Sequence, residues 1–245
     1  MFNYIYLSIH TLAMRNRPNP KNPHIEPEAV VRIGLEILDA EGLERVTLRQ
    51  IASRLGVQAP ALYWHFKDKS DIIDDMAQAI LKDGGIEDLV LPDDKSAWAE
   101  WLTQTAHSLR RTLLSHREGA RIVAGASFRS KAMVRLKTIS TQVLNEAGFD
   151  LLHASLAEET VIDYVWGYAI EEQANIPTKP IDLSLAMSVT SRSEIDPEWK
   201  FVEEVMDERK KLNEEEMFDW GLQAIIDGLK LSLNNSESHT KQRSH

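Results

Sequence analysis

Apolar residues recur at intervals of three and four along most of the chain, and this spacing is the strongest constraint on its fold. It is the spacing of one face of an α-helix, whereas a half-buried β-strand alternates every second residue. No useful length of the chain alternates in that way. Residues 27–40, for example, carry an apolar stripe made of Val30, Val31, Ile33, Leu35, Ile37 and Leu38. We therefore expect an all-α protein without an internal repeat.

The same spacing, read with helix-starting and helix-ending residues, predicts how the chain is organised. After the first helix we expect further helices over about 47–55, 60–66, 70–83, 96–115, 119–124, 130–147, 151–175, 198–211 and 214–233. They divide the chain into a flexible N-terminal arm (1–26), a small helical domain (27–70), a connecting helix with a linker (71–95), a larger helical domain (96–233) and a disordered polar tail (234–245). Met14 offers a second possible translation start. A loop over 177–197 is long enough to be functional or mobile.

Composition and charge narrow the class of protein. The 245 residues are 43% apolar and 27% charged, which is usual for a globular protein. The absence of cysteine excludes disulfides and thiolate metal sites and suits a cytoplasmic location. No run of about 18 apolar residues predicts a membrane span. The net charge is −10, yet residues 1–70 hold nine Lys/Arg against seven Asp/Glu, so the basic surplus is confined to the N-terminal part, as expected of a DNA-binding head.

Residues 27–66 have the spacing of a helix-turn-helix. Thr47 and Gln50 form a capping box at the start of the second helix, Gly56 permits the turn, and Pro60 suits the first turn of the third helix. The third helix would fit a major groove. Its candidate contact face comprises Gln58, Ala59, Pro60, Ala61, Tyr63, Trp64 and His65. The alternative is an ordinary bundle corner in which Tyr63 and Trp64 belong to the core.

Three segments carry a resemblance to a known family. Residues 47–69, TLRQIASRLGVQAPALYWHFKDK, resemble the DNA-binding signature of the TetR (tetracycline repressor) family. Residues 114–120, LSHREGA, and 167–173, GYAIEEQ, resemble effector-domain segments of the tetracycline repressors within that family. The similarity covers roughly 27–233.

The resemblance implies a homodimeric repressor that binds double-stranded, roughly palindromic operator DNA and a small-molecule effector. It assigns base reading to Arg49, which can form two hydrogen bonds to guanine, and base contact to Pro60 and Ala61. Thr47, Tyr63, His65 and Lys69 match phosphate or sugar contacts. Ala59 and Ala61 stand where those repressors carry glutamine and threonine, so we expect a different operator.

The effector positions depart further from the tetracycline repressors. Those proteins bind their drug as a magnesium chelate, and their metal-binding histidine falls on Val123, which cannot ligate a metal. A drug-binding asparagine falls on Thr105, a second histidine falls near Gly85, and only a glutamate is matched, by Glu171. We therefore expect no metal or cofactor and an apolar or aromatic effector. The candidate lining is Thr105, Leu109, Val123, Phe128, Tyr164, Trp166 and Glu171, although each of these could instead belong to the core or the dimer interface.

Other functions are weighed on the same residues. An enzyme is disfavoured because the chain shows no nucleophile–base pair, phosphate-binding glycine loop or metal motif. A TetR-like activator or a ligand-independent regulator stays open, since the sign of regulation depends on where the operator lies. The last helix carries an apolar stripe of Phe218, Leu222, Ile225, Ile226, Leu229 and Leu233. We expect this stripe, with the helix over 151–175, to form a four-helix dimer interface.

Overall fold

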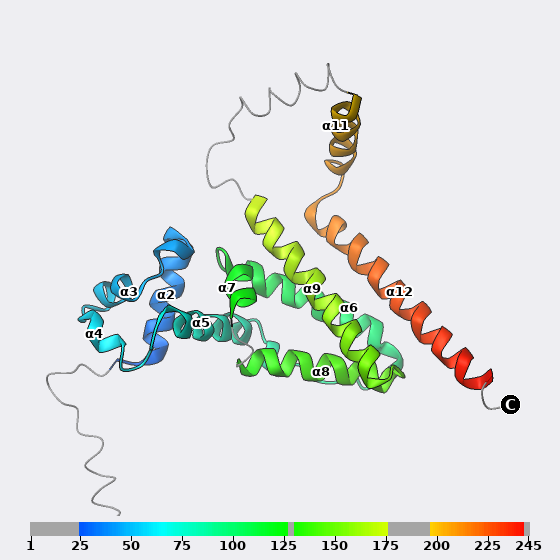
Figure 1. Ribbon diagram of the computed structural model, residues 1–245, viewed down its shortest axis with the longest axis horizontal. Coiled ribbons are helices and arrows are strands. Elements are labelled where there is room, and N and C mark those ends of the chain that lie inside the picture. Colours follow the sequence, from blue (N-terminus) through cyan, green and yellow to red (C-terminus); the bar gives the residue numbers. More distant parts are fainter. Residues whose placement is uncertain (1–24, 127–129, 176–196, 243–245) are drawn as a thin grey trace, which may run out of the picture.

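The computed structural model describes residues 25–126, 130–175 and 197–242, and all regular structure in these ranges is helical, which confirms the all-α prediction (Figure 1). A small N-terminal head lies at one end of the molecule. It is built from α2 (Pro27–Glu41), a 3-10 turn η1 (Leu43–Arg45), α3 (Leu48–Leu55) and the short α4 (Ala59–Leu62).

Helix α5 (Lys69–Asp83) runs from the head into a larger helical body. The body comprises η2 (Ile86–Asp88), η3 (Lys95–Ala97), α6 (Trp98–Leu114), α7 (Gly119–Gly125), α8 (Lys131–Ala147), α9 (Leu151–Asn175), α11 (Pro197–Arg209) and α12 (Glu214–Gln242). Helix α9 packs against α6, α8 and α12, while α11 stands apart from the other helices at the top of Figure 1.

Buried apolar side chains form one continuous cluster from the head through the body. Helix α5 belongs to both parts and is held closely in each. A Cβ at Gly34 of α2 would lie 2.9 Å from Met76 Sδ of α5, and a Cβ at Gly84 would clash with Thr112 of α6. A larger residue at Gly84 would have to displace Thr112, and one at Gly34 would have to move the flexible Met76 side chain, so α5 is closely packed against both the head and the body.

Local capping residues set the helix boundaries. Asp68 caps the start of α5, because its carboxylate accepts from Ser70 N at 2.8 Å and from Asp71 N at 3.3 Å. The linker predicted over 86–95 is closely packed at its start, where Ile86 is fully buried in η2.

Two predicted boundaries are wrong. The tail from 234 continues α12 to Gln242, because no glycine or proline interrupts 234–242. The third helix ends at Leu62 instead of 66, because the Leu62 carbonyl accepts from both His65 N and Phe66 N at 2.9 Å and tightens the chain into a turn. That turn buries Phe66, which is 2% exposed. Residues 1–24 of the predicted arm, residues 177–196 of the predicted loop and Phe128 lie outside the described residues.

Candidate nucleic-acid interface and effector site

The second helix of the head, α3, begins at a threonine cap. Thr47 Oγ1 accepts from Gln50 N at 3.2 Å, as the capping box requires. The reciprocal half of the box is absent, since Gln50 Nε2 donates to Glu41 Oε2 at 2.9 Å instead. Gln50 therefore ties α3 to the end of α2.

The turn after α3 depends on Gly56. Its φ of +69° is left-handed, and its amide donates to Ser53 O at 3.2 Å. Fully buried Ile51 on one side of this turn and Leu62 on the other anchor α3 and α4 in the core. The predicted helix-turn-helix is present, with a shorter second helix than expected.

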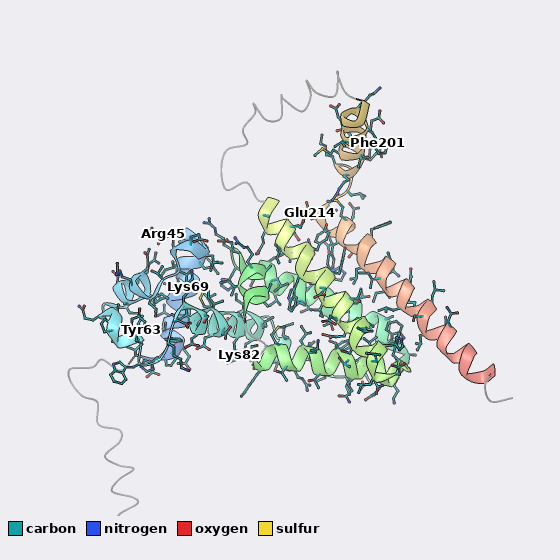
Figure 2. All side chains as sticks on the ribbon, in the orientation of Figure 1. Arg45, Tyr63, Lys69, Lys82, Phe201 and Glu214 are labelled. Carbon is teal, nitrogen blue, oxygen red and sulfur yellow. The ribbon has the colours of Figure 1, made fainter. Side chains whose placement is uncertain are left out.

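The predicted contact face of the head is exposed. Trp64 is 81% exposed and Tyr63 is 57% exposed, so the alternative that placed them in the core is wrong. Tyr63 lies at the tip of the head in Figure 2, and Gln58, Pro60 and His65 are also exposed. Ala59 and Ala61 are half-buried. Large aromatic side chains held in water at a helix-turn-helix tip are available to contact a partner.

Several cations of the head are held by its own acceptors. The Glu41 carboxylate accepts from Arg45 Nε at 3.2 Å and from Arg54 Nη2 at 2.5 Å. The hydrogen bond from Arg45 is the largest of the effects that together lower the pKa of Glu41, with Arg54 acting in the same direction. Lys69, a predicted phosphate contact, donates from Nζ to Leu43 O at 3.1 Å. Arg49 and Thr47 are exposed on the same head.

The head and the body are joined by contacts that sequence reasoning missed. Leu43 N donates to Glu118 Oε2 at 2.7 Å, and Glu118 has a left-handed φ of +55°. Asp39 Oδ2 lies 2.9 Å from His116 Nδ1, and Asp39 Oδ1 accepts from Arg117 N at 3.0 Å. The turn between α6 and α7 is therefore hydrogen-bonded to the end of α2 and to the start of η1. The resemblance marked this segment, but no local signal shows that its partner is Leu43, 75 residues away.

The candidate effector residues lie at different depths in the body. Thr105, Leu109 and Val123 are at most 4% exposed, and Glu171 is exposed. The Tyr164 hydroxyl donates to Phe218 O at 2.8 Å and so joins α9 to α12. Burial raises the pKa of Tyr164.

Among the cavities of the described part of the chain, three bear on the candidate residues. One of about 1170 Å³ lies at the junction of head and body, between Glu41–Glu44 and the turn between α6 and α7. One of about 500 Å³ is a groove along α8, and one of about 50 Å³ lies between α8 and α9. Of the six candidate effector residues that the structure describes, Trp166 lines the smallest of the three, and the other five line none of them. The structure thus does not bring the candidate residues together around any of these three cavities.

A buried ion pair beside the candidate residues has no signature in the sequence. Arg110 of α6 donates from Nε and Nη2 to the two carboxylate oxygens of Glu172 at 2.9 and 2.8 Å. The guanidinium carbon lies 4.9 Å from the ring centre of Phe218 and 5.7 Å from that of Tyr168. Because these residues come from α6, α9 and α12, the cluster fastens three helices together.

No group of three or more His, Asp or Glu side chains within 25–126, 130–175 and 197–242 is placed to hold a metal ion. None of the helices described is both long and apolar enough to cross a membrane.

Comparison with known proteins matches both parts of the chain. Residues 32–76 match the family described as bacterial regulatory proteins, tetR family, and residues 91–233 match the tetracyclin repressor-like C-terminal domain. A curated relative, the class A tetracycline repressor protein of Escherichia coli transposon 1721, is 32% identical over 222 residues, which is 89% of this chain and 97% of the relative.

Solved structures agree with this assignment. A possible TetR family regulator from Streptomyces coelicolor A3(2) is 29% identical with a TM-score of 0.72, covering 84% of this chain and all of that one. Mycobacterium smegmatis BioQ, solved with its double-stranded DNA operator, is 25% identical with a TM-score of 0.61, covering 84% of this chain and 98% of that one. The chain therefore belongs to the TetR family of DNA-binding transcriptional regulators, with an N-terminal helix-turn-helix and a C-terminal ligand-binding domain.

Proposed function

We propose that the protein is a homodimeric repressor that leaves a palindromic operator when its body binds a small, magnesium-independent organic effector. The observation that carries the DNA-binding part is the exposed face of the head, where Tyr63, Trp64 and His65 stand in water beside exposed Arg49. Two such heads related by a two-fold axis would reach half-sites about one helical turn apart, roughly 34–36 Å.

Measurement of operator preference tests the role of Arg49. Replacing Arg49 by alanine should relax the preference at one base pair and cost about 1–3 kcal/mol there, because an arginine that forms two hydrogen bonds to guanine discriminates by that amount. His65→Ala should weaken binding to all sequences alike. Arg32→Ala, which breaks an ion pair between exposed Arg32 and Glu36 on α2, is the control. Equal weakening of every sequence by Arg49→Ala would contradict its assignment to base reading.

Dimerisation is proposed through the outer faces of α9 and α12. Half of the stripe that the sequence suggested for this role lies inside the subunit, because Phe218, Leu222 and Ile226 are at most 2% exposed, while Ile225, Leu229 and Leu233 are half-buried. Apart from Leu151, which lines the groove along α8, the large apolar residues that remain outward on the described parts of the two helices are Leu152, Leu156, Trp220 and Leu231. Sedimentation of a Trp220→Glu, Leu231→Glu double variant should show monomers with little operator affinity, whereas an intact dimer would exclude this face.

Independence from magnesium is inferred from Val123. It stands where the tetracycline repressors carry a metal-binding histidine, and its side chain is buried in the apolar core. Aliphatic carbon offers no lone pair to a metal, and magnesium needs oxygen or nitrogen ligands. Release of the operator complex by candidate effectors, titrated with and without a chelator, should be unchanged by the chelator. Release by tetracycline with magnesium, abolished by chelation, would overturn this proposal.

A further inference from the structure

A small cavity between α8 and α9 is lined by side chains with buried polar atoms that lack a hydrogen-bond partner. It measures about 50 Å³, and its wall includes Lys137 of α8 and Glu158, Ile162 and Trp166 of α9. Two buried atoms of these side chains, Glu158 Oε2 and Trp166 Nε1, have no hydrogen-bond partner. Buried polar atoms are nearly always paired, and Glu158 Oε2 has only a long contact of 3.5 Å with Lys137 Nζ, so this oxygen can accept from a further donor in the cavity.

Burial without a close partner costs more free energy for the charged Glu158 than for the neutral Trp166. Its side chain is 4% exposed, and the nearest cation, Lys137 Nζ, stays 3.5 Å from Oε2 while its own side chain is 46% exposed. Burial raises the pKa of Glu158 although Lys137 opposes the shift, and the neighbouring charges of Glu159 and Asp163 raise it further. The buried carboxylate is therefore only partly compensated, a situation that a second cation would relieve.

The shape of the site limits what that cation can be. A cavity of about 50 Å³ accepts a head group of the size of a few water molecules, since one water needs roughly 10–15 Å³ of such space, whereas a cavity that holds a benzene ring measures about 150 Å³. Met133 and Lys137 also line the groove of about 500 Å³ along α8, which offers room for a larger body next to the cavity. Glu158 and Trp166 stand eight residues apart on α9, roughly 12 Å along its axis, so they mark the two ends of the site.

We propose that this cavity receives the protonated amine of an organic effector, which pairs with Glu158 while the apolar body of the molecule lies in the groove along α8. The proposal rests on the proposed function of the body as an effector domain, and it narrows the effector to an organic amine. Three carboxylates, Glu158, Glu159 and Asp163, line the cavity against the one cation of Lys137. This balance disfavours an anion and favours a cation over a neutral group of equal size.

Binding is tested on the full-length protein without DNA, with benzylamine as the probe and benzyl alcohol as its neutral counterpart of the same shape. The readout is the indole N–H resonance of Trp166, identified by its loss in Trp166→Phe. Benzylamine should shift this resonance in a saturable way. Glu158→Gln should weaken benzylamine at least tenfold, whereas Glu146→Gln, an equal charge change on α8 next to Lys95, should leave it within twofold.

Lys137→Gln supplies an independent test, in which the affinity for benzylamine should rise instead of fall. It removes the competing cation and should tighten benzylamine binding, so the proposal can still be judged if Glu158→Gln fails to fold. An unshifted Trp166 resonance, equal binding of benzyl alcohol, or equal losses from Glu158→Gln and Glu146→Gln would each overturn it. Operator binding is measured separately, because a protein that bound benzylamine at Trp166 but no DNA would refute the proposed function and leave this site standing.

Discussion

Removing one partner of the Arg110–Glu172 pair tests how much the body depends on a single buried contact. Both side chains are largely covered, with Arg110 11% and Glu172 18% exposed, and the two hydrogen bonds are parallel and short. Glu172→Ala leaves the guanidinium buried against two aromatic rings without its counter-ion. Breaking a buried pair in this way costs about 3–5 kcal/mol, and we expect the lower end because a little of each charge still reaches water.

Urea unfolding followed by circular dichroism measures that cost, which should appear as a lower midpoint at unchanged slope. The double variant Arg110→Met, Glu172→Leu removes both charges and should lose less stability than either single alanine variant. The coupling energy of the pair comes from a matched cycle of Arg110→Ala, Glu172→Ala and the double alanine variant, as the loss in the double variant minus the sum of the two single losses. A loss below about 1 kcal/mol in Glu172→Ala, the range of surface ion pairs, would show that water screens the contact and would refute this reasoning.

Three further predictions follow from burial and charge. Trp64→Ala should change the free energy of unfolding by no more than about 0.5 kcal/mol, since Trp64 is 81% exposed, while it weakens operator binding in a gel-shift assay; a large loss of stability would contradict its placement. Burial, followed by Glu214, raises the pKa of Tyr168 to about 12 from its ordinary 10.0. Stability from this group is present below pH 10 and lost as the pH rises to 12, so absorbance at 295 nm should show a late-titrating tyrosine that Tyr168→Phe removes. Because the pKa of Glu158 is raised above 4.5, its ionisation in the folded state is unfavourable. Glu158→Gln should therefore raise the melting temperature at pH 7 and have little effect near pH 4. An equal effect at both pH values would exclude ionisation as the cause.

Helix boundaries that depend on neighbouring residues could be predicted from the sequence. The threonine cap at Thr47, the left-handed glycine at Gly56 and the carboxylate cap at Asp68 act within four residues, so they can be recognised without a fold. The predicted exposure of the head's contact face also follows from local pattern, because Ile51 and Leu62 take the core positions and leave Tyr63 and Trp64 outside.

Contacts between distant segments could not be predicted. Glu118 meets Leu43 across 75 residues and Arg110 meets Glu172 across 62, and nothing near Glu172 distinguishes it from Glu171 beside it. Adjacent helical residues point about 100° apart, so the orientation of α9 decides that Glu172 is paired and Glu171 exposed. Half of the apolar stripe of α12, namely Phe218, Leu222 and Ile226, is covered by its own chain, which the sequence could not show for a related reason. A stripe shows that a helix is covered on one side, but not whether its own chain or a partner covers it.

The cluster around Glu41 affects how the head would respond to ionic strength. Arg45 and Arg54 are held by Glu41, Arg32 pairs with Glu36, and Lys69 donates to a backbone carbonyl. Of the cations in the described part of the head, Arg49, Lys67 and Lys69 make no ion pair, and Lys69 alone of these three donates to a backbone carbonyl. Each phosphate neutralised adds about 0.9 to the slope of log affinity against log salt. With few cations outside ion pairs, the head should release few counter-ions when it binds DNA. Its affinity for DNA should therefore fall only gradually as the salt concentration rises, and aromatic and hydrogen-bonding contacts should supply the remaining binding free energy.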